Sequence, residues 1–360
     1  MADYRTVGQR SAVAAVRAMA SRPPHAILML GPASVGKTTL ATDLAANLLC
    51  RAEPIDRPCG ECRACRRVAS GGHPDVHRLA PSGAADRIGL GGDQRATGVR
   101  DLVSALALRP VEGPVRVAII ERAHRLSEDA QHALLKTLEE PPPDTCIVLC
   151  ADDEDALLET VRSRCARVRL GPAGIRDVED LLEGRGLADR PTASRLARIA
   201  RGRPGEAVRL AASPEAIAIR AEIARTLVDL SSQRRHVRLA RLRDALGRAI
   251  EATTTIEPPA ADLEAGAAKR SAADRRRAAA WLVAVWRDVA YDVTLSQIGG
   301  SNAREPDLLE ETRAIGSAVP PAAMTAFLAR LDEASARLDA SASPELTLDV
   351  LALAWPAHAA

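Results

Sequence analysis

The sequence of 360 residues is poor in aromatic side chains, in lysine and in net charge. Phe, Trp and Tyr make up 2% of the chain, so the core must be built mainly from Leu, Val, Ile and Ala. Such a composition favours helical layers over an aromatic-rich β-sandwich. The 49 basic and 47 acidic residues leave a formal charge of +2. A global positive field is thereby excluded, and any contact with nucleic acid needs a local patch or a partner.

Long apolar runs are also missing. No uninterrupted apolar segment approaches the roughly 18 residues that a membrane-spanning helix needs, and Met1–Arg10 lacks the apolar region of a secretion signal. We therefore expect a cytoplasmic protein without membrane contact. Hydrophobic residues at 47% and charged residues at 27% are typical of soluble globular proteins, and the length allows two or three domains.

Strand-like and helix-like segments alternate through the first 170 residues, whereas the rest has helical patterns almost throughout. This asymmetry predicts an α/β domain with a mostly parallel sheet at 1–171, a small helical lid domain at 172–212 and an all-helical domain at 213–360. The predicted strands are Ala26–Leu30, Val76–Leu79, Val115–Ile120, Thr145–Cys150 and Arg167–Leu170. The predicted helices include Thr38–Leu49, Val99–Leu108, Glu128–Glu139, the lid helices Ile175–Glu183, Thr192–Ala200 and Gly205–Ala212, and a block Pro214–Ile250 that ends before a loop at Thr253–Ala268.

Residues 31–38 match the phosphate-binding pattern G-x-x-x-x-G-K-[ST] between an apolar strand and a helical run. The glycines let backbone N–H groups turn toward phosphate oxygens, and the following helix directs the positive end of its dipole at them. Lys37 is expected to reach the terminal phosphates of ATP, and Thr38 to ligate Mg²⁺. The predicted nucleotide-binding residues are Gly31, Pro32, Ala33, Ser34, Val35, Gly36, Lys37, Thr38 and Thr39.

Hydrolysis of a bound nucleotide needs an acidic residue after a later strand, and usually a second carboxylate that activates water. The strand predicted at Val115–Ile120 is followed by Glu121 and Arg122. Glu121 is suited to hold Mg²⁺, but Arg122 stands where a base is expected and remains protonated at physiological pH. The sequence therefore predicts nucleotide binding better than nucleotide hydrolysis.

Four cysteines form the pattern C-x8-C-x2-C-x2-C at Cys50, Cys59, Cys62 and Cys65. In a cytoplasmic chain such a cluster indicates a metal site, and four thiolates favour tetrahedral Zn²⁺. An iron–sulfur cluster is less favoured because the closing Cys-Pro of ferredoxin-type runs is absent. With four protein ligands no position is open for substrate, so the predicted zinc site is structural. His73 and His77 are alternative ligands, and Cys146, Cys150 and Cys165 are expected to be buried small residues.

In this order, the phosphate loop, the cysteine insert and the strand before Glu121 resemble the bacterial clamp-loader subunits of the AAA+ class. The resemblance covers about the first 210 residues; it is to the delta-prime type of DNA polymerase III subunit, with the gamma/tau type second. The matching segments are Val7-Gly8-Gln9, His25-Ala26, the cysteine spacing, Leu134–Pro142 and Ser163-Arg164-Cys165. The resemblance implies that 213–360 is a collar domain through which subunits assemble.

The resemblance also implies a role for Arg164 as an arginine finger that reaches the ATP site of a neighbouring subunit. A guanidinium supplied in trans stabilises the charge that develops on a transferred phosphoryl group. The alternative is an ordinary surface arginine at the start of a strand. The implied partners are clamp-loader subunits of the gamma/tau and delta types in a heteropentamer, and, through the complex, the sliding clamp and primer-template DNA.

Departures from the family's active ATPases separate the two types of subunit. A gamma-like motor would carry Asp-Glu where this chain has Glu121-Arg122, a polar sensor near Ala151 and an arginine sensor near Gly205. Arg203 is the available substitute for that last arginine. The departures favour a delta-prime-like stator that binds ATP without efficient hydrolysis, with an active gamma/tau-like motor subunit as the alternative. A small-molecule kinase is disfavoured because the sequence offers no evident acceptor site.

Two basic stretches lie on predicted helices of the last domain. We expect them to form solvated or inter-subunit faces rather than a surface that reads DNA bases, and we expect Trp281 and Trp286 to pack in a core. The arginines are Arg234, Arg235, Arg238, Arg241 and Arg243, then Arg270, Arg275, Arg276 and Arg277.

Overall fold

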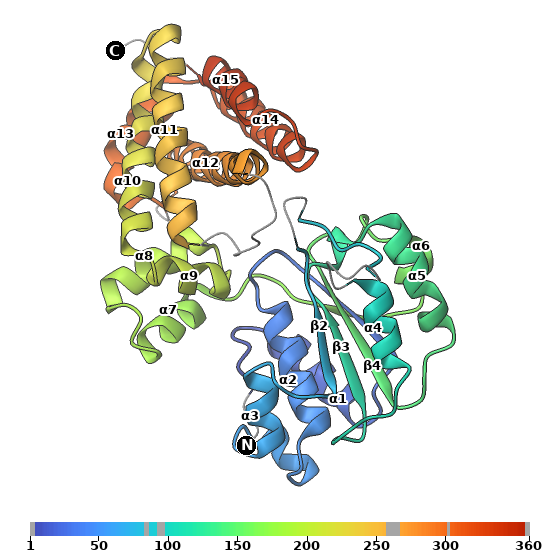
Figure 1. Ribbon diagram of the computed structural model, residues 1–360. Coiled ribbons are helices and arrows are strands. Elements are labelled where there is room, and N and C mark those ends of the chain that lie inside the picture. Colours follow the sequence, from blue (N-terminus) through green and yellow to red (C-terminus); the bar gives the residue numbers. More distant parts are fainter. Residues whose placement is uncertain (1–3, 83–85, 92–97, 257–266, 301–302, 357–360) are drawn as a thin grey trace. The chain divides into compact units, whose positions relative to one another are not determined.

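The computed structural model describes residues 4–82, 86–91, 98–256, 267–300 and 303–356, with the backbone alone for 267–271. The chain folds into two compact units (Figure 1). The first comprises Met1–Leu181 and Arg201–Gly205, and the second comprises Leu182–Ala200 and Glu206–Ala360. Both units take residues from the segment 172–212, and its separation as a lid domain stays a prediction.

The first unit is built on a five-stranded parallel sheet in the order β2-β3-β4-β1-β5. The strands are β1 (Ala26–Leu30), β2 (Val76–Leu79), β3 (Arg116–Ile120), β4 (Thr145–Ala151) and β5 (Ala166–Arg169). Each lies within one residue of its predicted bounds. Because all strands run in the same direction, their carboxyl ends meet at one edge of the sheet, where ligands bind in open α/β folds.

Helices cover both faces of this sheet (Figure 1). Alternate side chains of a strand point to opposite faces, so Ile27 and Met29 join one core and Leu28 joins the other. The first core also contains residues of α1 (Arg10–Ala20), α2 (Lys37–Leu49) and α3 (Arg63–Ala69). The second contains residues of α4 (Val99–Leu106), α5 (Glu128–Glu139) and α6 (Glu159–Arg162). As predicted, Cys146, Cys150 and Cys165 are buried in these cores.

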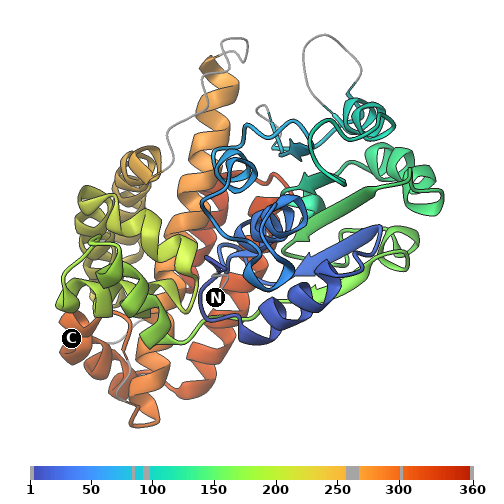
Figure 2. The ribbon, with the colours of Figure 1, turned by 90° about the horizontal axis from the view of Figure 1, so that it is seen from below.

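All secondary-structure elements described after residue 170 are helical, as the yellow-green to red segments show in both views (Figure 1, Figure 2). The fold class predicted from the sequence, a parallel α/β domain followed by helical segments, is confirmed. The α-helices are α7 (Ile175–Gly184), α8 (Arg190–Ala200), α9 (Pro204–Ala211), α10 (Pro214–Asp229), α11 (Arg235–Ile256), α12 (Ala267–Gln297), α13 (Leu309–Ala318), α14 (Pro321–Asp339) and α15 (Pro344–Ala354). Among the described residues no single helix is long and apolar enough to cross a membrane, and one bent pair, Pro306–Ala318 with Pro321–Asp339, meets that criterion by length and composition only.

The prediction of one helical block at Pro214–Ile250 is wrong in two details. A short 3₁₀ turn, η3 (Leu230–Ser232), separates α10 from α11, and α11 continues to Ile256, beyond the predicted start of the loop. The hydroxyls of Thr253, Thr254 and Thr255 donate to carbonyl oxygens four residues earlier, which satisfies these side chains within the helix. Residues 257–266 of the predicted loop lie outside the described residues.

The second unit concentrates the chain's few aromatic side chains in its core. Trp286, Phe327 and Trp355 are buried and pack with ring centroids 4.7–5.7 Å apart. Trp286 thus lies in a core as predicted, and Trp281 packs partly buried against the same core. The single Phe and two of the three Trp residues of the sequence therefore serve one hydrophobic cluster.

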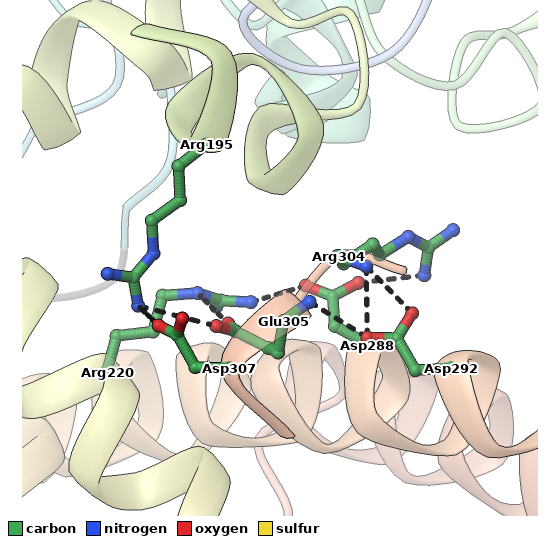
Figure 3. A network of polar contacts seen from close by, with 7 residues as sticks. All are labelled: Arg195, Arg220, Asp288, Asp292, Arg304, Glu305 and Asp307. Carbon is green, nitrogen blue, oxygen red and sulfur yellow. Dashed lines mark hydrogen bonds and ion pairs between the residues drawn. The ribbon is translucent and has the colours of Figure 1, made fainter. Parts of the chain in front are cut away.

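A group of buried charges links several segments of the second unit (Figure 3). Arg220 on α10 pairs with Asp288 on α12 at 2.7 Å and with Glu305 at 3.1 Å. Arg304 also pairs with Asp288, at 2.9 Å. Arg195 on α8 lies 3.7 Å from Glu305. We call this group, completed by the buried Asp292 and by the exposed Asp307 that pairs with Arg195, the buried charge cluster.

Candidate nucleotide and metal sites

The predicted phosphate loop joins β1 to α2 at the carboxyl edge of the sheet. Gly31 has φ +151°, and a Cβ atom there would overlap the carbonyl oxygen of Leu170. Gly36 has φ +105° and is the N-cap of α2. Both positions therefore require glycine, and the N-terminus of α2 follows the loop as a phosphate site needs.

Lys37 is buried at the start of α2, with 6% of its surface exposed. Its Nζ donates to the carbonyl oxygens of Gly31 and Pro32 at 2.6 and 2.7 Å. It also pairs with Asp152 Oδ1 at 2.6 Å. Asp152 directly follows β4, so the parallel strands bring it to the phosphate loop. Sequence reasoning noted the missing polar residue near Ala151 but missed Asp152, whose only signal is its place at the end of a buried strand.

His124 supports Asp152 from the segment after β3. The backbone N–H of Asp152 donates to His124 Nδ1 at 3.1 Å, and His124 Nε2 lies 3.7 Å from Asp152 Oδ2. Burial lowers the pKa of His124 below its usual value, against the opposing effect of Asp152. A neutral imidazole at pH 7 is consistent with Nδ1 as an acceptor. His124 therefore orients the end of β4.

The two predicted Mg²⁺ ligands lie in one neighbourhood, around the buried thiol of Cys150. Burial raises the pKa of Cys150 to about 12; Thr38 forms a side-chain hydrogen bond with it, and Glu121 acts on it through its charge. Glu121 already pairs with Arg78 at 3.2 Å, and Arg78 also donates to the hydroxyl of Thr42 at 2.7 Å. The Glu121 carboxylate thus has a cationic partner in this structure.

Arg122, at the position of the expected base, forms an ion pair with a carboxylate. It has φ +48° and pairs with Asp86 at 2.9 Å. A guanidinium in an ion pair neither accepts a proton nor activates water. The structure thus gives Arg122 a carboxylate partner, and the absence of a base stays a prediction.

Gly205, near which a gamma-like motor would carry its arginine sensor, contacts the phosphate loop through its backbone. Gly205 N–H donates to the carbonyl oxygen of Ser34 at 2.9 Å, and a Cβ atom at Gly205 would lie 3.2 Å from that oxygen. Any side chain here would crowd the loop. Gly205 therefore holds the phosphate loop through a backbone hydrogen bond, whereas an arginine at this position would offer a guanidinium to a phosphate.

Arg164 lies between the end of α6 and the start of β5, with 34% of its side chain exposed. Its guanidinium pairs with Glu139 at 2.7 Å and donates to the carbonyl oxygen of Thr160 at 2.8 Å. Glu139 ends α5, inside the segment Leu134–Pro142 noted in the sequence. Sequence reasoning missed this pairing, because the two residues are 25 positions apart.

The four cysteines of the insert converge, with Sγ atoms all within 4.8 Å of one another. The Sγ of Cys50 lies 3.6 Å from that of Cys59 and 3.9 Å from that of Cys62. Four thiolates around Zn²⁺ at about 2.3 Å would lie about 3.8 Å apart, so the donor set fits a tetrahedral zinc ion.

Backbone N–H groups surround these sulfur atoms. The N–H groups of Cys59, Cys62 and Cys65 each point to the Sγ of the preceding cysteine of the cluster at 3.4–3.5 Å. Burial would raise the pKa of Cys62, but N–H donors that include those of Arg51 and Cys65 outweigh it and lower the pKa to about 6. Such donors favour the thiolate form that binds metal.

The alternative ligands His73 and His77 have other partners. His73 is buried, and its Nδ1 accepts from the backbone N–H of Asp75 at 3.2 Å. His77 Nε2 lies 3.1 Å from a guanidinium nitrogen of Arg116. Neither joins the cysteines in the metal-compatible group found among the described residues.

The basic stretches of the second unit do not form one free cationic face. Arg238 is buried, which corrects its assignment to a solvated face; its guanidinium donates to the carbonyl oxygens of Ser231 and Trp355. Several of the others have acidic partners: Arg241 with Asp229, Arg243 with Asp349, Arg275 with Glu345 and Arg277 with Asp274. The side chain of Arg270 lies outside the described residues.

Residues 9–173 match a family model described as "DNA polymerase III, delta subunit". DNA polymerase III subunit delta′ of Pseudomonas aeruginosa is 41% identical over 143 residues, which cover 40% of this chain and 42% of that protein. Subunit delta′ of Bacillus subtilis is 30% identical over 215 residues, covering 60% and 62%. Subunit tau of Escherichia coli is 34% identical over 191 residues, covering 52% and 28%.

These similarities confirm the predicted resemblance to delta′ subunits of DNA polymerase III, with tau subunits as further relatives. The matched region spans from about two fifths to about three fifths of the length of the delta′ relatives named above. The family-model match, residues 9–173, includes the phosphate loop, the cysteine cluster, Glu121 and Arg164.

Proposed function

We propose that this chain is a delta′-like subunit of the DNA polymerase III clamp loader, which binds ATP without efficient hydrolysis and supplies Arg164 in trans to a neighbouring motor subunit. Together with gamma/tau-type and delta-type subunits in a heteropentamer, it helps to load the sliding clamp onto primer-template DNA in the cytoplasm. The observation that carries the proposal is a complete phosphate loop in a chain whose Arg122, at the position expected for the base, is paired with Asp86.

In this proposal Gly31–Thr39 holds ATP, and Thr38 and Glu121 hold Mg²⁺. Backbone N–H groups of the loop and the N-terminus of α2 bind the phosphates, and Lys37 neutralises their charge. Bound ATP with Mg²⁺ supplies a transferable phosphoryl group. The chain's own residues bind and orient it, but Arg122 offers no base to activate water. The Cys50, Cys59, Cys62 and Cys65 cluster holds a structural Zn²⁺.

Arg164 is available to a neighbour because its present bonds are at the surface. Its ion pair with Glu139 joins side chains that are 34% and 50% exposed, and exposed pairs contribute only about 0–1 kcal/mol. A triphosphate in a neighbouring subunit carries more negative charge than one carboxylate. It therefore draws the guanidinium away from Glu139, and the finger stabilises the transition state there.

The test is ATP turnover by a reconstituted clamp loader, stimulated by clamp and primed DNA, with Arg164→Ala in this chain. We expect turnover to fall at least about tenfold while the complex stays assembled in size-exclusion chromatography. Arg169→Ala is the matched control, because Arg169 is an exposed arginine of β5 that pairs with Glu154. The control should retain wild-type turnover.

Unchanged turnover in an intact Arg164→Ala complex would disprove the finger. A second measurement addresses the gamma/tau-like alternative, in which this chain is itself a motor with Arg203 as its sensor. Steady turnover by the isolated chain that disappears in Lys37→Ala would favour that motor over the stator.

A further inference from the structure

The ammonium of Lys37 has no donor left for a phosphate. An ammonium group offers three N–H donors, and Lys37 has three acceptors at 2.6–2.7 Å: two carbonyl oxygens of the loop and Asp152 Oδ1. A nucleotide phosphate can therefore bind Lys37 only by displacing one of these three oxygens.

Asp152 is the acceptor that a phosphate meets first. Its side chain is 29% exposed, whereas that of Lys37 is 7% exposed, so the carboxylate lies on the solvent side of the ammonium. The carboxylate also carries the same sign of charge as a phosphate, which the two carbonyl oxygens do not. It opposes nucleotide binding in two ways, by occupying Lys37 and by repelling the phosphate.

The carboxylate is held in this position by its surroundings. The backbone N–H of Asp152 donates a hydrogen bond to His124. Asp152 also directly follows β4, which is fixed in the sheet by its pairing with β1. On the other side of the loop, Gly205 N–H holds the Ser34 carbonyl. Both contacts lie within the first unit.

We propose that Asp152 is an internal competitor for Lys37 that weakens nucleotide binding and disfavours triphosphates more than diphosphates. The inference rests on the proposed ATP site and names a residue that sets its affinity and specificity. A P-loop lysine contacts the β- and γ-phosphates, so ATP brings more negative charge toward Asp152 than ADP does. The penalty from the carboxylate is therefore larger for ATP.

The test compares ATP and ADP binding to the full chain by isothermal titration calorimetry with Mg²⁺, for wild type and Asp152→Asn. Asn keeps the size and an oxygen acceptor but removes the charge. We expect Asp152→Asn to bind ATP about tenfold more tightly than wild type, with a smaller gain for ADP. Asp153→Asn is the matched control, because Asp153 is exposed and its Oδ1 accepts from the N–H of Asp155. It should leave both affinities unchanged.

Lys37→Ala and Asp152→Ala complete the set, and thermal melts establish that each variant is folded. Loss of binding in Lys37→Ala together with equal affinities of wild type, Asp152→Asn and Asp152→Ala would overturn the inference and leave the ATP site standing. Equal gains for ATP and ADP would overturn the discrimination between them. Absence of binding in wild type and in both Asp152 variants would refute the proposed ATP site itself, and the inference with it.

Discussion

Asp75 illustrates how one carboxylate orders a turn of the first unit. It directly precedes β2 and is fully buried. Oδ1 accepts from the N–H of Val111 at 2.6 Å, and Oδ2 accepts from the N–H groups of Glu112 and Gly113 at 2.8 Å. Burial raises the pKa of Asp75, but these three donors outweigh it and hold the pKa below its ordinary value of 3.8. The ionised carboxylate thus fixes the approach to β3.

The lowered pKa predicts a pH-dependent contribution to stability. Above pH 3.8 the folded state keeps the ionised, hydrogen-bonded carboxylate; this stabilisation is lost as the pH falls through the lower folded pKa. We expect Asp75→Asn to lower the free energy of unfolding by about 1–3 kcal/mol at pH 7, and by less at pH 3. Urea unfolding followed by circular dichroism at both pH values measures the difference in the free energy of unfolding between wild type and Asp75→Asn. Asp56→Asn, at an exposed position, is the control. A free-energy difference that does not change with pH would contradict the lowered pKa of Asp75.

At the scale of elements, the cysteine cluster braces the C-terminal end of α2. Cys62 is the N-cap of α3, and its Sγ accepts from the N–H of Cys65. The amide of Asn47 donates to the carbonyl oxygen of Arg57 at 3.0 Å, which ties the insert to α2. The phosphate loop lies at the opposite end of this helix, roughly 20 Å away at 1.5 Å per residue.

This separation predicts that the metal stabilises the fold without tuning the nucleotide site. We expect the purified chain to hold one Zn²⁺, and Cys62→Ser or a chelator to lower the melting temperature by about 5 °C or more. Nucleotide affinity should change less than about threefold. Metal analysis by mass spectrometry, thermal melts and calorimetry are the measurements. Cys146→Ala, on β4 outside the cluster, should keep its zinc, and a full zinc content in Cys62→Ser would contradict the four-cysteine site.

Elements with local signals were predictable from the sequence. The bounds of α5 agree with the prediction, because prolines follow its end and the structure shows Ser127 as an N-cap that accepts from the N–H of Ala130. The break at η3 was not, because Leu230–Ser232 contains neither Gly nor Pro. There the guanidinium of Arg238, seven positions further along the chain, donates to the carbonyl oxygen of Ser231. The pairing of Asp152 with Lys37 was not predictable either, because it depends on the order of the strands in the sheet.

On the scale of a whole unit, the buried charge cluster holds α8, α10 and α12 together in the second unit (Figure 3). Asp292 accepts from the backbone N–H groups of Arg304 and Glu305, so the segment before α13 is fixed as well. Burial raises the pKa of Glu305, against the opposing charges of Arg220 and Arg195. Breaking such a cluster leaves charges without partners inside the unit.

Arg220→Met should therefore lower the free energy of unfolding of the second unit by about 3–5 kcal/mol at pH 7. Asp288 and Glu305 then lose their buried cation. The loss should be smaller at pH 5, because removing Arg220 raises the pKa of Glu305 further, and a carboxyl group whose folded pKa is raised favours the folded state as the pH falls. Tryptophan fluorescence during urea unfolding reports on this unit, since Trp281, Trp286 and Trp355 all lie in it.

Arg337→Met is the control for that experiment. Arg337 and Glu333 form an exposed pair on α14, for which about 0–1 kcal/mol is expected. An equal effect of the two substitutions would show that the buried charge cluster contributes no more than a surface pair.

The division of residues between the two units means that the backbone passes from one to the other three times, at 181–182, 200–201 and 205–206. The five residues Arg201–Gly205 return to the first unit, where Gly202 accepts from the N–H of Ala173 at 2.7 Å and Gly205 bonds to Ser34. A chimaera spliced at residue 181 would give the first unit these five residues from a foreign parent. A chimaera of two homologues therefore needs residues 1–181 and 201–205 from the same parent.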